Sequence, residues 1–144
     1  MSERAPILYC ETVEVSLQIG PDIQDITRDL STIVGKAGIA EGSLHATVIG
    51  STGSVTTIEY EPGVVEDLKR AIRRLAPPEE DYAHELAWHD GNGHSHVQAA
   101  LLGPSLVVPV RGAALALGTW QQVVVINHDN KPRKRRVEIT LMGA

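Results

Sequence analysis

The chain has 144 residues, 42% of them apolar and 22% charged, which is the length and composition of one globular domain with its own core rather than of a disordered segment. Its net charge of -5 argues against a dedicated nucleic-acid-binding protein, and no apolar run approaches the roughly 18 residues of a membrane span. Glu11 and Glu14 interrupt the apolar run near the start and the single Cys10 has no partner for a disulfide, so we expect a cytoplasmic protein without a signal peptide.

The first half of the chain alternates between strand and helix patterns. Alternating apolar residues predict a half-buried strand over Ile7 to Ile19. Apolar residues at helical spacing then predict an amphipathic helix from Ile23 to Val34, ending near Lys36 to Gly38. Two strands follow, over Ser43 to Ile49 and Val55 to Tyr60.

The second half begins with a helix from Pro62 to Leu75, which Pro77-Pro78 ends. A long polar connection, Ala76 to Gly93, follows; such loops in compact domains are usually functional or disordered. Ser95 and Gln98 match a capping box and predict a short helix to Leu102 with Ser95 as its N-cap. Strands are then expected over Leu106 to Val110, Ala114 to Leu117, Gln121 to His128 and Arg135 to Met142.

About seven strands and two or three helices without regular alternation predict a single α+β domain over residues 1–144, with a mainly antiparallel sheet.

The clearest functional signal is the segment from Tyr82 to His96. It holds four of the six histidines together with Glu85 and Asp90, and Asp81 directly precedes it. Neutral imidazole is the commonest metal ligand in proteins, and carboxylates often accompany it. We therefore expect a divalent metal site here, with zinc as the first candidate. The alternative is a solvated polar loop whose histidines bind nothing, because the spacing matches no diagnostic zinc motif.

A second signal is the loop Gly50 to Ser54, whose small residues expose backbone N–H groups suited to anionic oxygens. A plain turn between strands explains it equally well. Glu59, in the strand that follows, is a candidate acid/base group or ligand, or else an outward-facing strand residue.

The basic run Lys131 to Arg136 is typical of a solvated turn, and phosphate binding by an arginine is its functional alternative. Trp120 is expected in the core or at a subunit interface, and Gln121 as a buried hydrogen-bonding residue.

Several blocks of the sequence together resemble one known family. They are GHSHVQAALLGPS at 93–105, VPV at 108–110, LALGTWQ at 115–121, TTIEYEPGV at 56–64, the pair Tyr82 and His84, and RRVEI at 135–139. This combination resembles the YjbQ family, small proteins linked to a secondary thiamine-phosphate synthase activity. The resemblance spans nearly the whole chain.

The resemblance implies the family's α+β fold and a homotrimer with sheets packed about the threefold axis. It also implies a site at or near a subunit boundary, with His84 and His96 binding a metal or an anion, Glu59 nearby, and Trp120 and Gln121 lining or supporting the site.

One position departs from the family pattern. Most relatives begin the small-residue loop with histidine, in the pattern H-T-T-A, where this chain has Gly50. We expect either that His94 and His89 replace the missing ligand, or that this chain has weakened or changed the metal site.

These features are compatible with three functions. The first is an enzyme that acts on a small phosphorylated molecule, as in the joining of a pyrimidine diphosphate to a thiazole phosphate. The second is a metal-dependent hydrolase or lyase in which Glu59 or Asp90 moves the proton, and the third is a non-catalytic trimeric protein that binds a metal or an anion. The candidate residues are Glu59 and His96 for catalysis, Ser51, Thr52, Gln121 and Arg135 for phosphate binding, and His84, His89, His94 and His96 for the metal.

Overall fold

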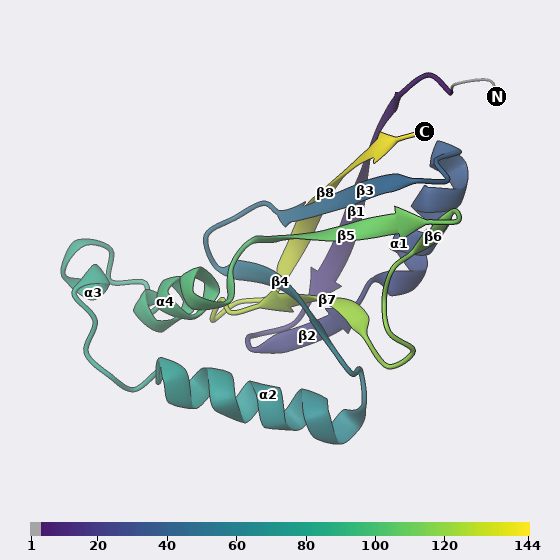
Figure 1. Cartoon of the computed structure of the whole chain (residues 1–144). Coiled ribbons are helices and arrows are strands. Elements are labelled where there is room, and N and C mark those ends of the chain that lie inside the picture. The colour runs from purple at the N-terminus through teal and green to yellow at the C-terminus, as the bar shows by residue number, and fades with distance from the viewer. Residues whose placement is uncertain (1–3) are drawn as a thin grey trace.

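The computed structural model describes residues 4–144, which form two antiparallel sheets and four helices (Figure 1). The five-stranded sheet has the order β1-β8-β3-β5-β6, and the three-stranded sheet has the order β2-β7-β4. The strands are β1 (Ile7–Leu17), β2 (Asp22–Asp25), β3 (Gly42–Val48), β4 (Gly53–Ile58), β5 (Ser105–Arg111), β6 (Ala114–Leu115), β7 (Gln122–Asn127) and β8 (Arg133–Gly143). The helices are α1 (Thr27–Ala37), α2 (Pro62–Leu75), α3 (His84–Ala87) and α4 (Gly93–Leu102).

This architecture confirms the predicted α+β class with mainly antiparallel sheets. It is built in layers: the five-stranded sheet, the three-stranded sheet and α2 follow one another (Figure 1). The helix α1 lies at one end of the sheets, and α3 and α4 lie at the other end.

The central strand β7 is buried on both of its faces, because side chains alternate between the two sides of a strand. Val123 and Val125 belong to the main core between the sheets. Val124 and Ile126 point the other way and pack with Ile72 of α2 in a second core. The strand therefore joins the two apolar clusters, and its nearly unbroken run of valine and isoleucine reflects burial on both sides.

The helix α2 begins as the sequence predicts, at Pro62. The carboxylate of Glu61 accepts hydrogen bonds from the N–H groups of Gly63 and Val64, and so caps the helix. At its other end, Ile72 is almost completely buried, whereas Leu75 is 56% exposed. The helix therefore attaches to the domain through a narrow apolar face.

The predicted helix over Ile23 to Val34 begins too early. Asp22–Asp25 forms the short strand β2, which pairs with β7, and α1 starts only at Thr27. The carboxylate of Asp25 accepts hydrogen bonds from the N–H and the hydroxyl of Thr27, which favours the turn between strand and helix. The helix does end as predicted, with Gly38 in the left-handed conformation.

The strand β1 ends at Leu17, two residues before the predicted end, and the other predicted strands are found with shifts at their ends. The long connection after α2 contains the additional one-turn helix α3. No helix within residues 4–144 has the length and apolar character that a membrane crossing requires.

The narrow attachment of α2 makes a pair of matched variants informative. Ile72→Ala removes a side chain from the second core, so we expect the free energy of unfolding to fall by about 2–5 kcal/mol. Leu75→Ala changes an exposed residue of the same helix and should cost less than about 0.5 kcal/mol. Urea unfolding followed by circular dichroism measures both, and equal losses for the two variants would contradict the described packing.

Candidate functional site

The carboxylate of Glu85 helps to hold the segment between α3 and α4 in place. Glu85 of α3 accepts hydrogen bonds from the N–H groups of Gly91 (2.7 Å) and Gly93 (2.8 Å). Gly93 is the first residue of α4, so this carboxylate lies at a helix N-terminus, where the helix dipole favours negative charge. A β-carbon at Gly93 would lie 2.3 Å from Cβ of Tyr82, so only glycine permits this close packing.

The prediction that Ser95 caps α4 is wrong. The helix begins at Gly93, with Asn92 in the N-cap position, and Ser95 lies inside its first turn. The Ser95 hydroxyl donates to Oδ1 of Asn92, and Gln98 bonds to other segments of the fold. The capping-box pattern therefore failed because Ser95 bonds to the N-cap residue Asn92 within the same turn, and Gln98 bonds to Ala76 and His128 in other segments.

His84, Asp90 and His96 come together to form what we call the histidine cluster. Their potential ligand atoms all lie within 4.8 Å of one another. Nε2 of His84 lies 3.0 Å from Oδ1 of Asp90, and the rings of His84 and His96 are 4.6 Å apart. The cluster contains both histidines that the resemblance selected, joined by a carboxylate that the sequence analysis did not assign as a ligand.

Two imidazoles and a carboxylate are a donor set that fits zinc. Tetrahedral zinc with bonds of about 2.0–2.1 Å keeps its ligand atoms about 3.4 Å apart, so small side-chain movements would suffice. The hydrogen bond from the N–H of Asn92 lowers the pKa of Asp90, which keeps this carboxylate ionised. With three protein ligands, a fourth position would stay open for water or substrate.

His94 and His89 do not belong to this cluster. His94 is buried beside Ser95, whose Oγ lies 3.2 Å from its Nε2, and burial lowers the pKa of His94. His89 is exposed, and its backbone has a positive φ of 53°. Neither of them therefore supplies a further ligand to the histidine cluster.

A hollow of about 400 Å³ lies beside His96, and we call it the basic hollow. Its wall combines segments that are far apart in the sequence. They are the loop Gly50–Thr52, the residues Asp90, Asn92 and His96, and Asp129 with Arg133, Lys134 and Arg135. The hollow thus joins the histidine cluster, the small-residue loop and the basic run of the sequence.

Asp129, only 2% exposed, holds this wall together. Its carboxylate accepts hydrogen bonds from Thr52 Oγ1 (3.0 Å) and Asn92 Nδ2 (3.1 Å), and it pairs with Nε of Arg133 (3.1 Å). Burial by itself would raise the pKa of Asp129, but these donors outweigh burial and lower the pKa. The carboxylate is therefore ionised and fully engaged in structural bonds.

His128 is a second buried node, which the sequence analysis did not single out. It is 1% exposed, and its ring lies between Oγ of Ser54 (2.8 Å) and Oε1 of Gln98 (3.0 Å). The amide of Gln98 donates to the carbonyl oxygen of Ala76. This chain fixes α4 against both β4 and the end of α2. The signal in the sequence was a polar His-Asp pair directly after an apolar strand.

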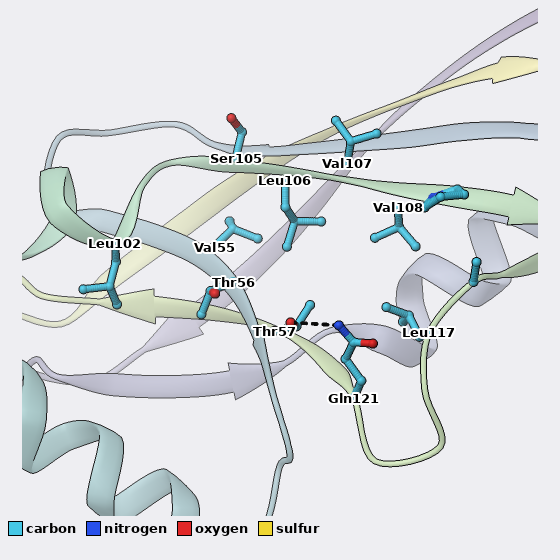
Figure 2. A pocket seen from close by; sticks show the side chains of 12 residues that line it. Val55, Thr56, Thr57, Leu102, Ser105, Leu106, Val107, Val108, Leu117 and Gln121 are labelled. Carbon is cyan, nitrogen blue, oxygen red and sulfur yellow. Dashed lines mark hydrogen bonds between the residues drawn. The ribbon is translucent and has the colours of Figure 1, made fainter.

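Glu59 and Gln121 lie elsewhere. Glu59 follows β4, about 20 Å along the strand from Thr52, and it lines another hollow with the 73% exposed Trp120. Gln121 is exposed and donates to Oγ1 of Thr57 at the mouth of a cavity of about 380 Å³ between β4 and β5 (Figure 2). Within one chain, these residues do not meet the histidine cluster.

Comparisons with known proteins agree with this fold. Residues 11–144 match the family model for UPF0047, YjbQ-like proteins. A UPF0047 protein of Methanothermobacter thermautotrophicus is 32% identical over 136 residues, which cover 94% of this chain and 93% of that protein. The UPF0047 protein YjbQ of Salmonella typhimurium is 32% identical over 83% of this chain and 84% of its own length.

Solved structures give the same result. A YbjQ-like protein of unknown function from Sulfolobus solfataricus superposes with a TM-score of 0.92 at 31% identity, covering 97% of this chain and 100% of that one. A YjbQ/UPF0047 protein from Clostridium acetobutylicum gives a TM-score of 0.79 at 29% identity, covering 90% of this chain and 98% of that one. The chain belongs to the YjbQ-like UPF0047 family, as the sequence blocks predicted.

The buried position of His128 predicts a dependence of stability on pH. Burial, and then the charge of Arg135, lower its pKa from 6.5 to about 4. Between these values the unfolded chain binds more protons than the folded one. We therefore expect His128 to contribute a loss of about 3 kcal/mol of unfolding free energy as the pH falls from about 6.5 to about 4.

Urea unfolding at several pH values, for the wild type and for His128→Gln, measures this contribution. The difference between their unfolding free energies should change over that pH range and level off above and below it. Parallel curves for the two proteins would show that His128 does not titrate in this way.

Proposed function

We propose that this protein is a metal-dependent enzyme that acts on a small phosphorylated molecule in the basic hollow. The observation that carries the proposal is the shared wall: His96 belongs both to the histidine cluster and to a hollow lined by Arg133, Lys134 and Arg135. Metal ligands and cations on one hollow suit a substrate with phosphate oxygens, because both stabilise negative charge.

A divalent ion, with zinc as the first candidate, would supply positive charge to neutralise phosphate oxygens on a leaving group. His84, Asp90 and His96 are the residues that would hold it. Ser51 and Thr52 line the hollow from the small-residue loop. The Thr52 hydroxyl is already engaged with Asp129 and Arg135, so it positions the wall, whereas the exposed Ser51 is available to a ligand.

The family resemblance suggests the reaction to test first, the joining of a pyrimidine diphosphate to a thiazole phosphate with release of pyrophosphate. The mixed wall of metal ligands and cations supports this choice, since the leaving pyrophosphate carries several negative charges. A cytoplasmic location is part of the proposal, because a chain with one cysteine suits a reducing compartment.

Two alternatives use the same residues. A metal-dependent hydrolase or lyase would place water at the open position of the metal. A non-catalytic protein would hold only the metal or an anion. The hollow beside His96 favours an enzyme, because a site that only binds a metal needs no room for a substrate.

We also propose that the protein is a homotrimer. Strand register places Leu8, Met142, Ser43 and Pro109 in one row across the outer face of the five-stranded sheet, and Cys10, Thr140, His45 and Val107 in the next row. Both rows lack Asp, Glu, Lys and Arg, and Leu8, Val107 and Met142 are 48–68% exposed in the single chain. An exposed face with so few charges supports burial between subunits.

The proposed metal site predicts that substitutions of different histidines change the zinc affinity to different extents. Zinc added to the metal-free protein should bind at one site per chain. Because second-shell changes alone cost 10- to 100-fold in metal affinity, loss of the direct ligand in His96→Ala should cost more than about 100-fold. His89→Asn and His45→Ala remove histidines outside the cluster and should bind zinc as the wild type does. Isothermal titration calorimetry and metal analysis measure this, and unchanged binding by His96→Ala and His84→Ala would refute the site.

Assays of the same proteins for thiamine phosphate, made from the two precursors with and without zinc, test the reaction. We expect product from the wild type only with metal, and much less from His96→Ala. If zinc binds to the cluster but no product forms under either condition, the synthase reaction is excluded, and the hydrolase, lyase or binding functions remain.

The trimer is tested by light scattering after size-exclusion chromatography. The wild type should have three times the 15.5 kDa mass of the chain. Val107→Glu places a charge in the second outer row and should lower this mass, whereas Ser31→Glu on the exposed side of α1 should not. A wild-type mass equal to that of one chain would exclude the trimer.

A further inference from the structure

Arg135 is an unusual cation for a protein interior. It lies near the start of β8 and is 6% exposed. Its Nη2 donates to Oγ1 of Thr52 (2.5 Å) and Oδ1 of Asn127 (2.6 Å). Both acceptors are uncharged, so these bonds orient the guanidinium without neutralising it.

The neighbouring cations differ in this respect. Arg133 pairs with Asp129, and Lys134 pairs with Glu14 at 2.9 Å. Arg135 has no carboxylate within 4.0 Å among residues 4–144. A buried charge is costly unless a counter-charge accompanies it. Arg135 is therefore the cation of the basic hollow without a carboxylate in direct contact, and Asp129 acts on it only at longer range, with the Thr52 hydroxyl between them.

Its hydrogen bonds are incomplete as well. Nε of Arg135 is buried and has no acceptor among the described residues. Buried arginine N–H groups normally have acceptors, so a missing one needs an explanation. Nε itself has less than 1 Å² of accessible surface, so it shows that the guanidinium is incompletely paired and is not a contact point for a ligand. A ligand oxygen in the hollow would place a negative charge beside this guanidinium.

Gly50 provides the space for this guanidinium. A β-carbon at position 50 would lie 2.7 Å from Nη1 of Arg135, and the backbone φ of 127° also favours glycine there. Any larger residue would displace the guanidinium from its place under the loop. Gly50 and Arg135 thus depend on one another, although they are far apart in the sequence.

We propose that Gly50 and Arg135 form an oxyanion subsite that binds a phosphate group of the ligand. The planar guanidinium matches the spacing of phosphate oxygens, and the wall of the hollow carries no other unpaired cation among residues 4–144. This inference deepens the proposed function and rests on it for the identity of the hollow as the substrate site. It adds that phosphate binding does not require the metal, because Arg135 is not a ligand of the histidine cluster.

Metal-free protein is titrated with inorganic phosphate and with pyrophosphate by calorimetry, at low ionic strength. We expect both to bind to the wild type, and Arg135→Gln to weaken binding by about 10- to 100-fold, as the loss of a charge-assisted hydrogen-bonding pair does. Lys36→Gln removes an exposed cation far from the hollow and is the matched control. No binding to the wild type, or unchanged binding to folded Arg135→Gln, would overturn the subsite.

Two further variants separate this role from a purely structural one. Arg135→Lys keeps the charge but loses the planar fork, so it should bind more tightly than Arg135→Gln and more weakly than the wild type. Gly50→Ala keeps the arginine but moves it, so it should also weaken phosphate binding. If Arg135→Gln does not fold, Arg135→Lys and Gly50→Ala decide the outcome. Phosphate affinity equal to that of the wild type in both variants would overturn the subsite.

Zinc titration of the same variants separates this inference from the proposed metal site. Arg135→Gln should bind zinc normally, and His84→Ala, which changes a residue of the histidine cluster outside the wall of the hollow, should bind phosphate normally when metal is absent. If the wild type binds phosphate but not zinc, the metal proposal alone is refuted. If the wild type binds zinc but not phosphate, the subsite alone is refuted.

Discussion

The carboxylate of Asp129 joins three separate parts of the chain in the wall of the basic hollow. It binds Thr52 in the loop after β3, Asn92 at the start of α4, and Arg133 at the start of β8. A charge at 2% exposure is tolerable only because each oxygen has its donors. The positions of the small-residue loop, the histidine cluster and the basic run relative to one another depend on these bonds.

The strand β7 explains why this carboxylate is buried. Its four apolar residues fill cores on both sides, and the chain then continues directly into Asn127, His128 and Asp129 without reaching the surface. Each of these polar side chains therefore needs partners inside the protein, and the partners come from β4, α4 and β8. The change from apolar to polar residues at the end of one buried strand thus leads directly to Asp129 in the wall of the hollow.

The histidine segment illustrates how far residue patterns reach. Its composition identified a region with ligand chemistry, and the family blocks selected His84 and His96, which do lie together. His94 was one of the histidines expected to replace the ligand that is missing at Gly50, but His94 lies buried beside Ser95. Instead, the structure places the guanidinium of Arg135 under Gly50, where no ligand of the cluster lies.

The sequence by itself determined the α+β class, the approximate positions of all strands except β2, and the family, because alternation, helical periodicity and turn residues act over short distances. It also located the histidine segment and the basic run. Only the tertiary structure decided that Asp90 completes the histidine cluster, that Ser95 is not a cap, and that no carboxylate among residues 4–144 lies within 4.0 Å of the Arg135 guanidinium. These properties depend on which distant side chains share the available donors and acceptors, and that competition is settled by the packing of β7, β8 and α4 around Asp129.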